Sequence, residues 1–168
     1  IINAEFPKHH LEKLEYMLDG GKRLRPIIGT AFCNRSGSNG NGCNFHNSKL
    51  VNNWDLLAIV EIIHNTSLIL DDTPQMDNDS TRRDLPAFHV KYGCKATYLF
   101  AYNLLGWIGK YLSSKYKSYL ASDIQHLAII NTVYQELLSL IQGQYKDLKW
   151  KPTTQDISSA IPSKYGPT

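Results

Sequence analysis

The chain has 168 residues, 42% of them hydrophobic and 20% charged, which is typical of one globular domain with a sizeable core. Its 18 basic and 15 acidic residues leave a net charge of +3, too small to indicate nucleic-acid binding. Three cysteines without a CxxC pair argue against a disulfide framework and favour a reducing compartment, so we expect a cytoplasmic protein. No apolar run is long enough to predict a membrane span.

The first third of the chain predicts two helices and a loop. Apolar residues at three- and four-residue spacing predict a helix over residues 8–20, which two glycines end. A short buried helix is predicted over 25–33, because Pro26 suits a first helical turn. Residues 34–48 are rich in glycine, asparagine and serine, so they predict a flexible loop.

Three longer helices are expected further along. Residues 54–70 are apolar on nearly every side, as in the central helix of a bundle. Helices are also predicted over 95–116 and 124–148, and no strand pattern competes. The prolines and small polar residues of 151–168 predict an irregular tail. The expected fold is therefore an all-α bundle of about six helices, forming one domain over 1–150.

The segment "HNTSLILDDTPQMDNDSTRRDLPAFH" concentrates charge directly after the central helix. It holds five aspartates: Asp71, Asp72, Asp77, Asp79 and Asp84. At about 100° per residue, His64, Ser67 and Asp71 share one helical face. Asp71 and Asp77 lie about 600° apart, so they converge only if the helix breaks. Pro74 is expected to supply that break.

Three interpretations of this segment compete. Clustered carboxylates prefer hard cations, and Mg²⁺ is commonly held by one or two carboxylates together with substrate phosphates, to which Arg82 and Arg83 offer planar forks. A calcium-binding EF-hand loop starting at Asp77 fails, because Arg82 stands where glycine is needed and Phe88 where the bidentate glutamate is needed. The third interpretation is a charged, solvated turn between helices.

A second basic cluster favours the phosphate interpretation. "GGKRLRP" places Lys22, Arg23 and Arg25 after two glycines, which allow cations and backbone amides to approach an anion. With the Asp-rich segment, it implies two anionic groups, one bridged by metal and one held by cations.

These residues resemble the trans-isoprenyl diphosphate synthases, or polyprenyl synthetases, and within them the geranylgeranyl and farnesyl diphosphate synthases. The matching stretches are "GGKRLRP", "HNTSLILDDTPQMDNDSTRR", "PAFHVKYG" and "GQYKDL", in the family's order and spacing. The resemblance implies an all-α isoprenoid synthase bundle, normally a homodimer. It also implies a Mg²⁺-assisted prenyltransferase that joins isopentenyl diphosphate to a dimethylallyl, geranyl or farnesyl diphosphate.

The resemblance also implies a role for each motif residue. The first Asp-rich motif, Asp71, Asp72 and Asp77, would surround Mg²⁺ and the allylic diphosphate, which Arg82 would also hold. The diphosphate of isopentenyl diphosphate would be held by a basic set: Lys22, Arg23, Arg25, His64 and Arg83. Gln144 and Asp147 would line the cavity near the metal and the reacting carbons.

In this family, bulk on the turn before the first aspartate limits product length. Thr66 and Ser67 occupy that turn here and are small, so the resemblance implies geranylgeranyl diphosphate or a longer product.

The chain departs from the family in three ways. Asp156 is the only acidic residue after Asp147, so the second Asp-rich motif that completes the family's metal clamp does not occur. Asp84 replaces the glycine usual after the paired arginines, and the N-terminal helix region is short. The first residue is Ile1 rather than Met, which indicates a trimmed start. We therefore expect a chain that lacks the C-terminal half and a trimmed start that carried any targeting segment. The alternative is a non-catalytic or regulatory subunit of a heteromeric synthase.

Overall fold

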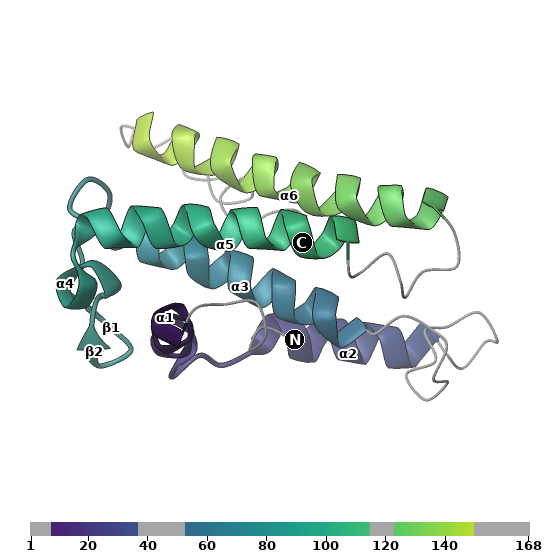
Figure 1. The fold of residues 1–168 in the computed structure, drawn as a ribbon, viewed down its shortest axis with the longest axis horizontal. Coiled ribbons are helices and arrows are strands. Elements are labelled where there is room, and N and C mark those ends of the chain that lie inside the picture. Colours follow the sequence, from purple (N-terminus) through teal and green to yellow (C-terminus); the bar gives the residue numbers. More distant parts are fainter. Residues whose placement is uncertain (1–7, 37–52, 115–122, 150–168) are drawn as a thin grey trace, which may run out of the picture. The chain divides into compact units, whose positions relative to one another are not determined.

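The computed structural model describes residues 8–36, 53–114 and 123–149 (Figure 1). This part of the chain contains α1 (Lys8–Leu18), α2 (Leu24–Ser36), α3 (Asn53–Asp71), β1 (Thr81–Arg82), β2 (Leu85–Pro86), α4 (Phe88–Tyr92), α5 (Cys94–Ser114) and α6 (Asp123–Lys149). The expected all-α class is confirmed. The chain divides into two compact units, residues 1–115 and 116–168, and each is described by itself.

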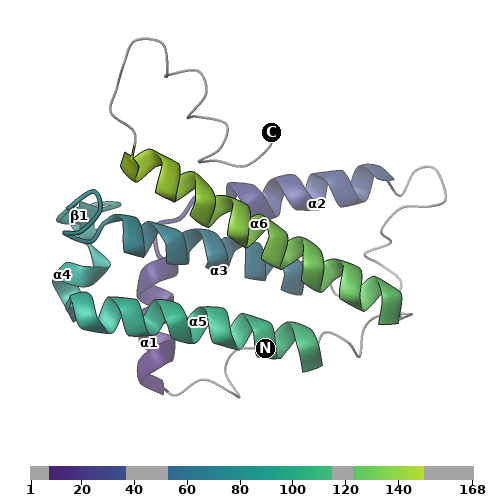
Figure 2. The same cartoon turned by 90° about the horizontal axis from the view of Figure 1, so that it is seen from above.

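In the first unit, α3 lies between α2 and α5, and it also contacts α1 (Figures 1 and 2). Its core side chains include Ile59, Ile62 and Ile69. The facing side of α5 buries residues at four-residue spacing, namely Phe100, Leu104, Ile108 and Leu112. Both apolar faces meet in one core, which confirms the prediction that residues 54–70 form the central helix.

The connection from α1 to α2 follows the predicted signals. Gly20 ends α1 in the left-handed region, with φ of 64°, where a glycine meets no Cβ penalty. Pro26 is the third residue of α2, where the backbone N–H that it lacks would have had no helical partner. α2 continues to Ser36, three residues past its predicted end, so the loop prediction was wrong for residues 34–36. Residues 37–48 of that loop lie outside the described residues.

A short hairpin follows α3, although the sequence predicted no strand. β1 and β2 pair antiparallel, with Thr81 opposite Pro86 and Arg82 opposite Leu85. Each strand has two residues, too few to show the alternation that identifies a strand in sequence. The hairpin leads into α4, where Phe88 stacks on Phe100 of α5 with ring centroids 5.2 Å apart. This contact fixes the end of the hairpin to the core.

The second unit contributes α6, which agrees within one residue at each end with the helix predicted over 124–148. The boundary between the two units falls inside 1–150, so the single-domain assignment stays a prediction. The tail predicted over 151–168 lies outside the described residues. Within the described ranges, every helix is too short or too polar to cross a membrane.

Candidate functional site

At the end of α3 the chain folds back on itself. The amide of Asp77 donates a 2.8 Å hydrogen bond to the carbonyl oxygen of Asp71, and the amide of Asp79 donates one of 3.1 Å to the carbonyl oxygen of Asp72. The helix ends three residues before Pro74. The side chain of Asp77 is exposed and that of Asp71 is partly exposed. The prediction that a break returns Asp77 to Asp71 is therefore confirmed for the backbone.

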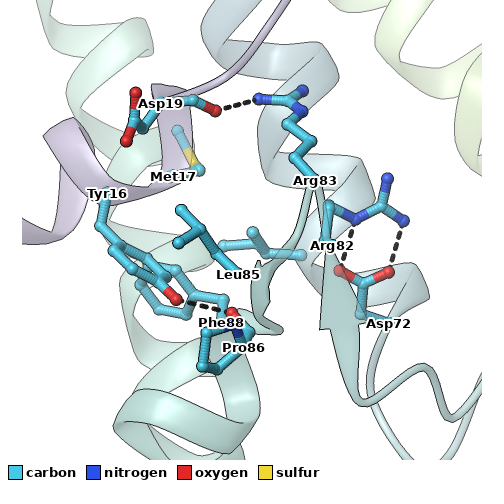
Figure 3. A pocket seen from close by; sticks show the side chains of 10 residues that line it. Tyr16, Met17, Asp19, Asp72, Arg82, Arg83, Leu85, Pro86 and Phe88 are labelled. Carbon is cyan, nitrogen blue, oxygen red and sulfur yellow. Dashed lines mark hydrogen bonds and ion pairs between the residues drawn. The ribbon is translucent and has the colours of Figure 1, made fainter.

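Asp72 is fully buried and forms a bidentate ion pair with Arg82 of β1 (Figure 3). Arg82 Nε donates to Oδ2 at 2.5 Å, and Nη2 donates to Oδ1. The hydrogen bond to Asp72 raises the pKa of Arg82, burial opposes that rise, and the charges of Asp72, Asp71 and Asp79 add to it. Arg82 is thus a permanent cation held at one edge of the Asp-rich turn.

The two-residue loop of the hairpin consists of Arg83 and Asp84. Their φ angles are 53° and 63°, the pair of positive values that a type I′ turn requires. This turn explains why the family usually has glycine where Asp84 stands, because glycine adopts positive φ without steric cost. It also directs the Arg83 side chain away from that of Arg82, toward the end of α1 (Figure 3).

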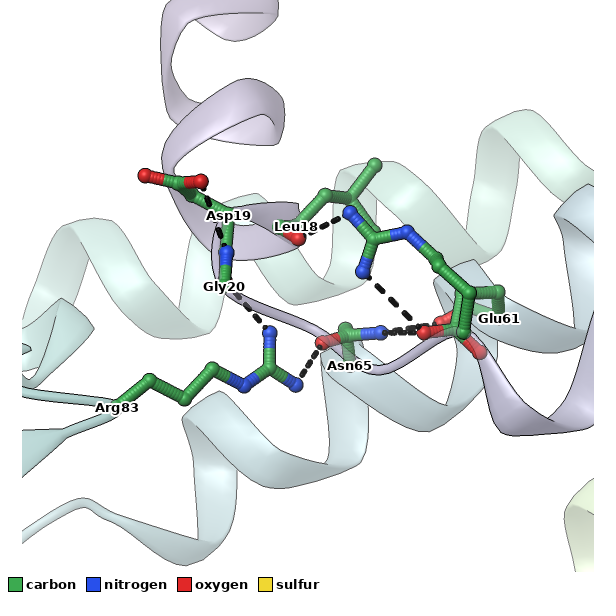
Figure 4. Close-up of polar contacts among 7 residues, drawn as sticks. Leu18, Asp19, Gly20, Glu61, Asn65 and Arg83 are labelled. Carbon is green, nitrogen blue, oxygen red and sulfur yellow. Dashed lines mark hydrogen bonds and ion pairs between the residues drawn. The ribbon is translucent and has the colours of Figure 1, made fainter.

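Arg83 is held at two points (Figure 4). Its Nη1 donates to the carbonyl oxygen of Asp19 at 2.8 Å, and its Nη2 donates to Asn65 Oδ1 at 2.8 Å. The amide nitrogen of Asn65 in turn donates to Glu61 Oε1 at 3.1 Å and to the Glu61 carbonyl at 2.8 Å. Burial lowers the pKa of Arg83, and the charges of Arg82 and Arg23 lower it further.

Arg23 approaches the same carboxylate from the other side. Its Nη1 lies 3.5 Å from Glu61 Oε1, and its Nη2 donates to the carbonyl oxygen of Leu18. Gly21 admits both guanidinium groups, since a Cβ there would lie 2.0 Å from Nη1 of Arg23 and 3.0 Å from Nη1 of Arg83. Of the three basic residues predicted to cluster after the two glycines, Arg23 thus lies close to Arg83 of the hairpin.

The remaining basic residues of the predicted cluster are more accessible. Lys22 is exposed, and so is Arg25 in the first turn of α2. His64 is partly buried on α3. Burial lowers the pKa of His64 to about 4, the positive charges of Arg25, Arg83 and Arg82 act in the same direction, and Glu61 opposes them. At neutral pH His64 is therefore an uncharged hydrogen-bonding group.

The two chain-length positions differ in their surroundings. Thr66 is buried, and its Oγ1 donates to the carbonyl oxygen of Ile62 at 2.8 Å. Ser67 is partly exposed, and its Oγ donates to the carbonyl oxygen of His64 at 2.8 Å. Ser67 is four residues before Asp71, so the two side chains point in directions about 40° apart around the helix axis. Thr66 is five residues before Asp71, and the corresponding angle is about 140°. Ser67, and not Thr66, therefore shares the face of Asp71.

A small hollow lies behind the two arginines, lined by Tyr16, Met17 and Leu85 as well as Arg82 and Arg83 (Figure 3). It has room for about one water molecule. A diphosphate does not fit there, so any diphosphate must bind on the open sides of these arginines.

Gln144 and Asp147 lie one turn apart on α6, and the sequence predicted that both would line the cavity near the metal. α6 belongs to the second unit, so the role of these two residues beside the Asp-rich turn stays a prediction.

Within the described ranges, no group of three or more histidine, cysteine, aspartate or glutamate side chains is arranged to hold a metal ion. The bidentate pairing of Asp72 with Arg82 is one reason, because Asp72 is buried, whereas Asp71, Asp77 and Asp79 reach the surface of the turn. This donor set fits a magnesium ion that arrives with a diphosphate, since Mg²⁺ takes one or two carboxylates and completes its octahedron with phosphate oxygens and water.

The sequence did not identify Asn65 or the acceptor role of Glu61. The sequence did contain one signal for them: Glu61 and Asn65 are polar and lie one turn apart in a largely apolar helical segment. Polar side chains that are buried must find hydrogen-bond partners.

Comparison with known proteins agrees with these features. A family model described as polyprenyl synthetase matches residues 7–165. A geranylgeranyl diphosphate synthase of Cyanophora paradoxa is 31% identical over 153 residues, covering 88% of this chain and 47% of that protein. The heterodimeric geranylgeranyl pyrophosphate synthase large subunit 1, chloroplastic, of Arabidopsis thaliana is 30% identical over 140 residues, covering 82% of this chain and 35% of that protein.

The fold is shared with solved structures as well. An FPP/GFPP synthase from Zymomonas mobilis superposes with a TM-score of 0.71 at 27% identity, covering 95% of this chain and 55% of that one. The chain thus spans about half of the length of these relatives or less.

Proposed function

Because the chain belongs to the polyprenyl synthetase family, we propose that it acts as a trans-prenyltransferase that condenses isopentenyl diphosphate with an allylic diphosphate. One observation carries this proposal. The adjacent residues Arg82 and Arg83 are held by different acceptors, Asp72 for the first and Asn65 with Asp19 for the second. The hairpin therefore supplies one cation to each of two separate places, as a reaction between two diphosphates requires.

The allylic diphosphate is assigned to the Asp-rich turn. Asp71 and Asp77 would hold Mg²⁺ together with the phosphate oxygens, and Arg82 would donate to the same diphosphate from the hairpin. Asp72 keeps Arg82 in place through its bidentate pair. Bound Mg²⁺ would neutralise negative charge on the departing diphosphate.

Isopentenyl diphosphate is assigned to the basic cluster. Arg83 and Arg23 would contact its diphosphate. Lys22, which precedes α2, and Arg25, in the first turn of α2, are exposed and would supply further charge. His64 would donate a neutral hydrogen bond, because its pKa of about 4 leaves it uncharged at neutral pH. Cations at fixed positions bind a diphosphate with less reorganisation than mobile ones do.

The reaction that follows from these assignments breaks the bond between C1 of the allylic group and its diphosphate oxygen, whose electron pair leaves with the diphosphate. The double bond of isopentenyl diphosphate then attacks C1, and the resulting cation gives up a proton to the departed diphosphate, which restores a double bond. Arg82 favours the first step by stabilising the charge that develops on the leaving group. Gln144 and Asp147 would face the reacting carbons.

The hydrocarbon tail of the growing product is expected to run along α3 below Asp71. Val60 and Ser67 lie on that helical face, and Val60 is exposed in this unit. Since Ser67 is small, we assign a product of geranylgeranyl length or longer.

The protein is also proposed to work as a dimer, either with itself or with a related subunit. The similarity to a relative named as the large subunit of a heterodimeric synthase supports the second possibility. A non-catalytic subunit remains the alternative function. Two features argue against this alternative: the chain has both Asp71 and Asp77, and its arginines are held in place by hydrogen bonds. A scaffold subunit has no need of carboxylates that bind a metal ion or of arginines that bind a diphosphate.

The test is incubation of the product of the complete open reading frame with Mg²⁺, labelled isopentenyl diphosphate and farnesyl diphosphate. Elongated product that disappears in EDTA and in an Asp71→Asn, Asp77→Asn double variant is expected. Absence of product with dimethylallyl, geranyl and farnesyl diphosphates alike would contradict the enzyme assignment. Native mass spectrometry of the same preparation would give the oligomeric state.

A further inference from the structure

We infer that Glu61 and Asn65 are positioning residues, which hold Arg23 and Arg83 in the orientation that binds the diphosphate of isopentenyl diphosphate (Figure 4). This inference rests on the proposed function. It assigns a role to two buried side chains of α3 that take no direct part in the reaction.

Hydrogen-bond donation runs in one direction, from Arg83 to Asn65 and from Asn65 to Glu61. The side-chain amide nitrogen of Asn65 donates to the Glu61 carbonyl oxygen at 2.8 Å and to Glu61 Oε1 at 3.1 Å. Its Oδ1 accepts from Arg83 at 2.8 Å. An amide held in this way cannot flip without losing three bonds. Its oxygen therefore offers Arg83 a fixed acceptor, polarised by the carboxylate behind it.

Burial makes a purely stabilising role a poor explanation. Glu61 is 6% exposed and Asn65 is 1% exposed, and Glu61 Oε2 has no hydrogen-bond partner in the described part of the chain. A buried carboxylate with an unsatisfied oxygen does not by itself favour folding, and apolar residues of similar size often do as well or better. What Glu61 provides is a negative charge that contacts Arg23 directly and Arg83 through Asn65.

That charge matters because the arginines crowd one another. Nη1 of Arg23 and Nη1 of Arg83 both lie next to Gly21, since a Cβ on that residue would be 2.0 Å from the first and 3.0 Å from the second. Two guanidinium groups this close repel, and the negative charge of Glu61, which contacts Arg23 directly and Arg83 through Asn65, offsets part of that repulsion. Both arginines also have φ of 53°, a backbone conformation that residues other than glycine adopt only when their surroundings hold them there.

The positioned arginine still has donors for a ligand. A guanidinium carries five N–H groups, and Arg83 uses two of them, one for Asp19 and one for Asn65. The others are left for phosphate oxygens. Because the group is already fixed at two points, binding orders it little further.

Glu61→Gln separates positioning from simple electrostatics. The substitution adds one unit of positive charge beside the cluster, and charge alone would tighten binding of an anion. Positioning predicts the opposite, a Kd for inorganic diphosphate raised about three- to tenfold, since Arg23 loses its partner and Asn65 loses its charged acceptor. The Kd is measured by calorimetry on the full chain in EDTA, so that metal-bridged binding at the Asp-rich turn does not contribute.

Glu15→Gln is the matched control, because Glu15 is exposed on α1 and the chemical change is the same. It should leave the Kd unchanged or slightly lower it. A Glu61→Gln chain that binds diphosphate as tightly as the wild type, or more tightly, would overturn the inference while leaving the proposed function intact. A wild-type chain that binds no diphosphate in EDTA would overturn both.

A double-mutant cycle provides a second, independent measurement. Asn65→Leu removes the acceptor of Arg83 without changing charge, and it should raise the Kd about tenfold in the wild-type background. In an Arg83→Ala background the same substitution should have no further effect. Equal effects in both backgrounds would show that Asn65 acts through the fold and not through Arg83. Circular dichroism of each variant confirms that the helices are retained.

Discussion

Arg82 binds both carboxylate oxygens of Asp72, a fully buried residue ten positions earlier in the chain. The pair joins the hairpin to the end of α3, so it fixes the orientation of the entire Asp-rich turn. In this structure both carboxylate oxygens of Asp72 are paired with Arg82, whereas the adjacent Asp71 is partly exposed, and the predicted metal-binding role of Asp72 stays a prediction.

Asp72→Asn should lower the free energy of unfolding by about 2 kcal/mol, since it weakens a paired, buried carboxylate while Arg82 stays partly solvated. Urea denaturation measures the change. Asp79→Asn, the same substitution at an exposed position of the same turn, should change stability by less than about 0.5 kcal/mol. Equal effects of both variants would mean that the ion pair contributes nothing beyond net charge.

Asp84→Gly should stabilise the chain by about 0.5–1 kcal/mol, because Asp84 has φ of 63° and glycine adopts that conformation freely. Asp84→Ala is the informative comparison. It removes the same charge but keeps a Cβ, so it should not stabilise. Thermal melts of the two variants decide the matter, and a stabilisation shared by both would assign the effect to charge instead of the turn.

Gly21→Ala should weaken diphosphate binding about tenfold or more, since the added methyl group would overlap Nη1 of Arg23 and press on Nη1 of Arg83. Gly106→Ala serves as the control. Nothing lies within 4 Å of a Cβ at Gly106, on α5, so alanine there should leave binding unchanged and raise stability by about 1 kcal/mol. Unaltered diphosphate affinity in Gly21→Ala would refute the role given to this glycine.

The pKa of His64 predicts a pH dependence of stability. Its value falls from 6.5 in the unfolded chain to about 4 in the folded one, so the unfolded state binds more protons between these values. The contribution of His64 to the free energy of unfolding is therefore at its maximum above about pH 6.5, and it is lost as the pH falls toward 4. His64→Gln, which cannot titrate, should lose less stability over that interval, and parallel curves for the two proteins would contradict the prediction.

Ser67→Tyr should shorten the products of the proposed reaction, because Ser67 shares the face of Asp71 along which the chain would grow. Chromatography of labelled products measures the length distribution. Thr66 is buried in the core, so a tyrosine there would disturb packing before it reached the product. An unchanged distribution in a folded Ser67→Tyr enzyme would remove this residue from length control.

The helices could be predicted because their signals are local. The apolar content of residues 54–70 and the periodic pattern of residues 124–148 both indicate a helix more strongly than any other structure. The observed helices α3 and α6 agree closely with these predicted ranges. The return of Asp77 to Asp71 was predictable for the same reason, since helix geometry excludes convergence on an unbroken helix and Pro74 stands within the gap.

The hairpin and the arginine network were not predictable in this way. A two-residue turn formed by Arg83 and Asp84 lacks the Asn-Gly signature, and strands of two residues carry no periodicity. The contact between Asn65 and Arg83 joins residues eighteen positions apart, and it depends on a turn that the sequence does not reveal. Long-range polar contacts follow from tertiary structure, whereas helices follow from neighbours in the chain.

The type I′ turn has one more consequence. It joins two arginines assigned to two different substrates through a single peptide bond, so a shift of the hairpin toward one ligand also displaces the cation that serves the other. Occupancy of one site should then change the affinity of its neighbour, and by thermodynamic reciprocity the second ligand must change the affinity of the first by the same factor. The hairpin would thus make the binding of the two substrates cooperative within one chain.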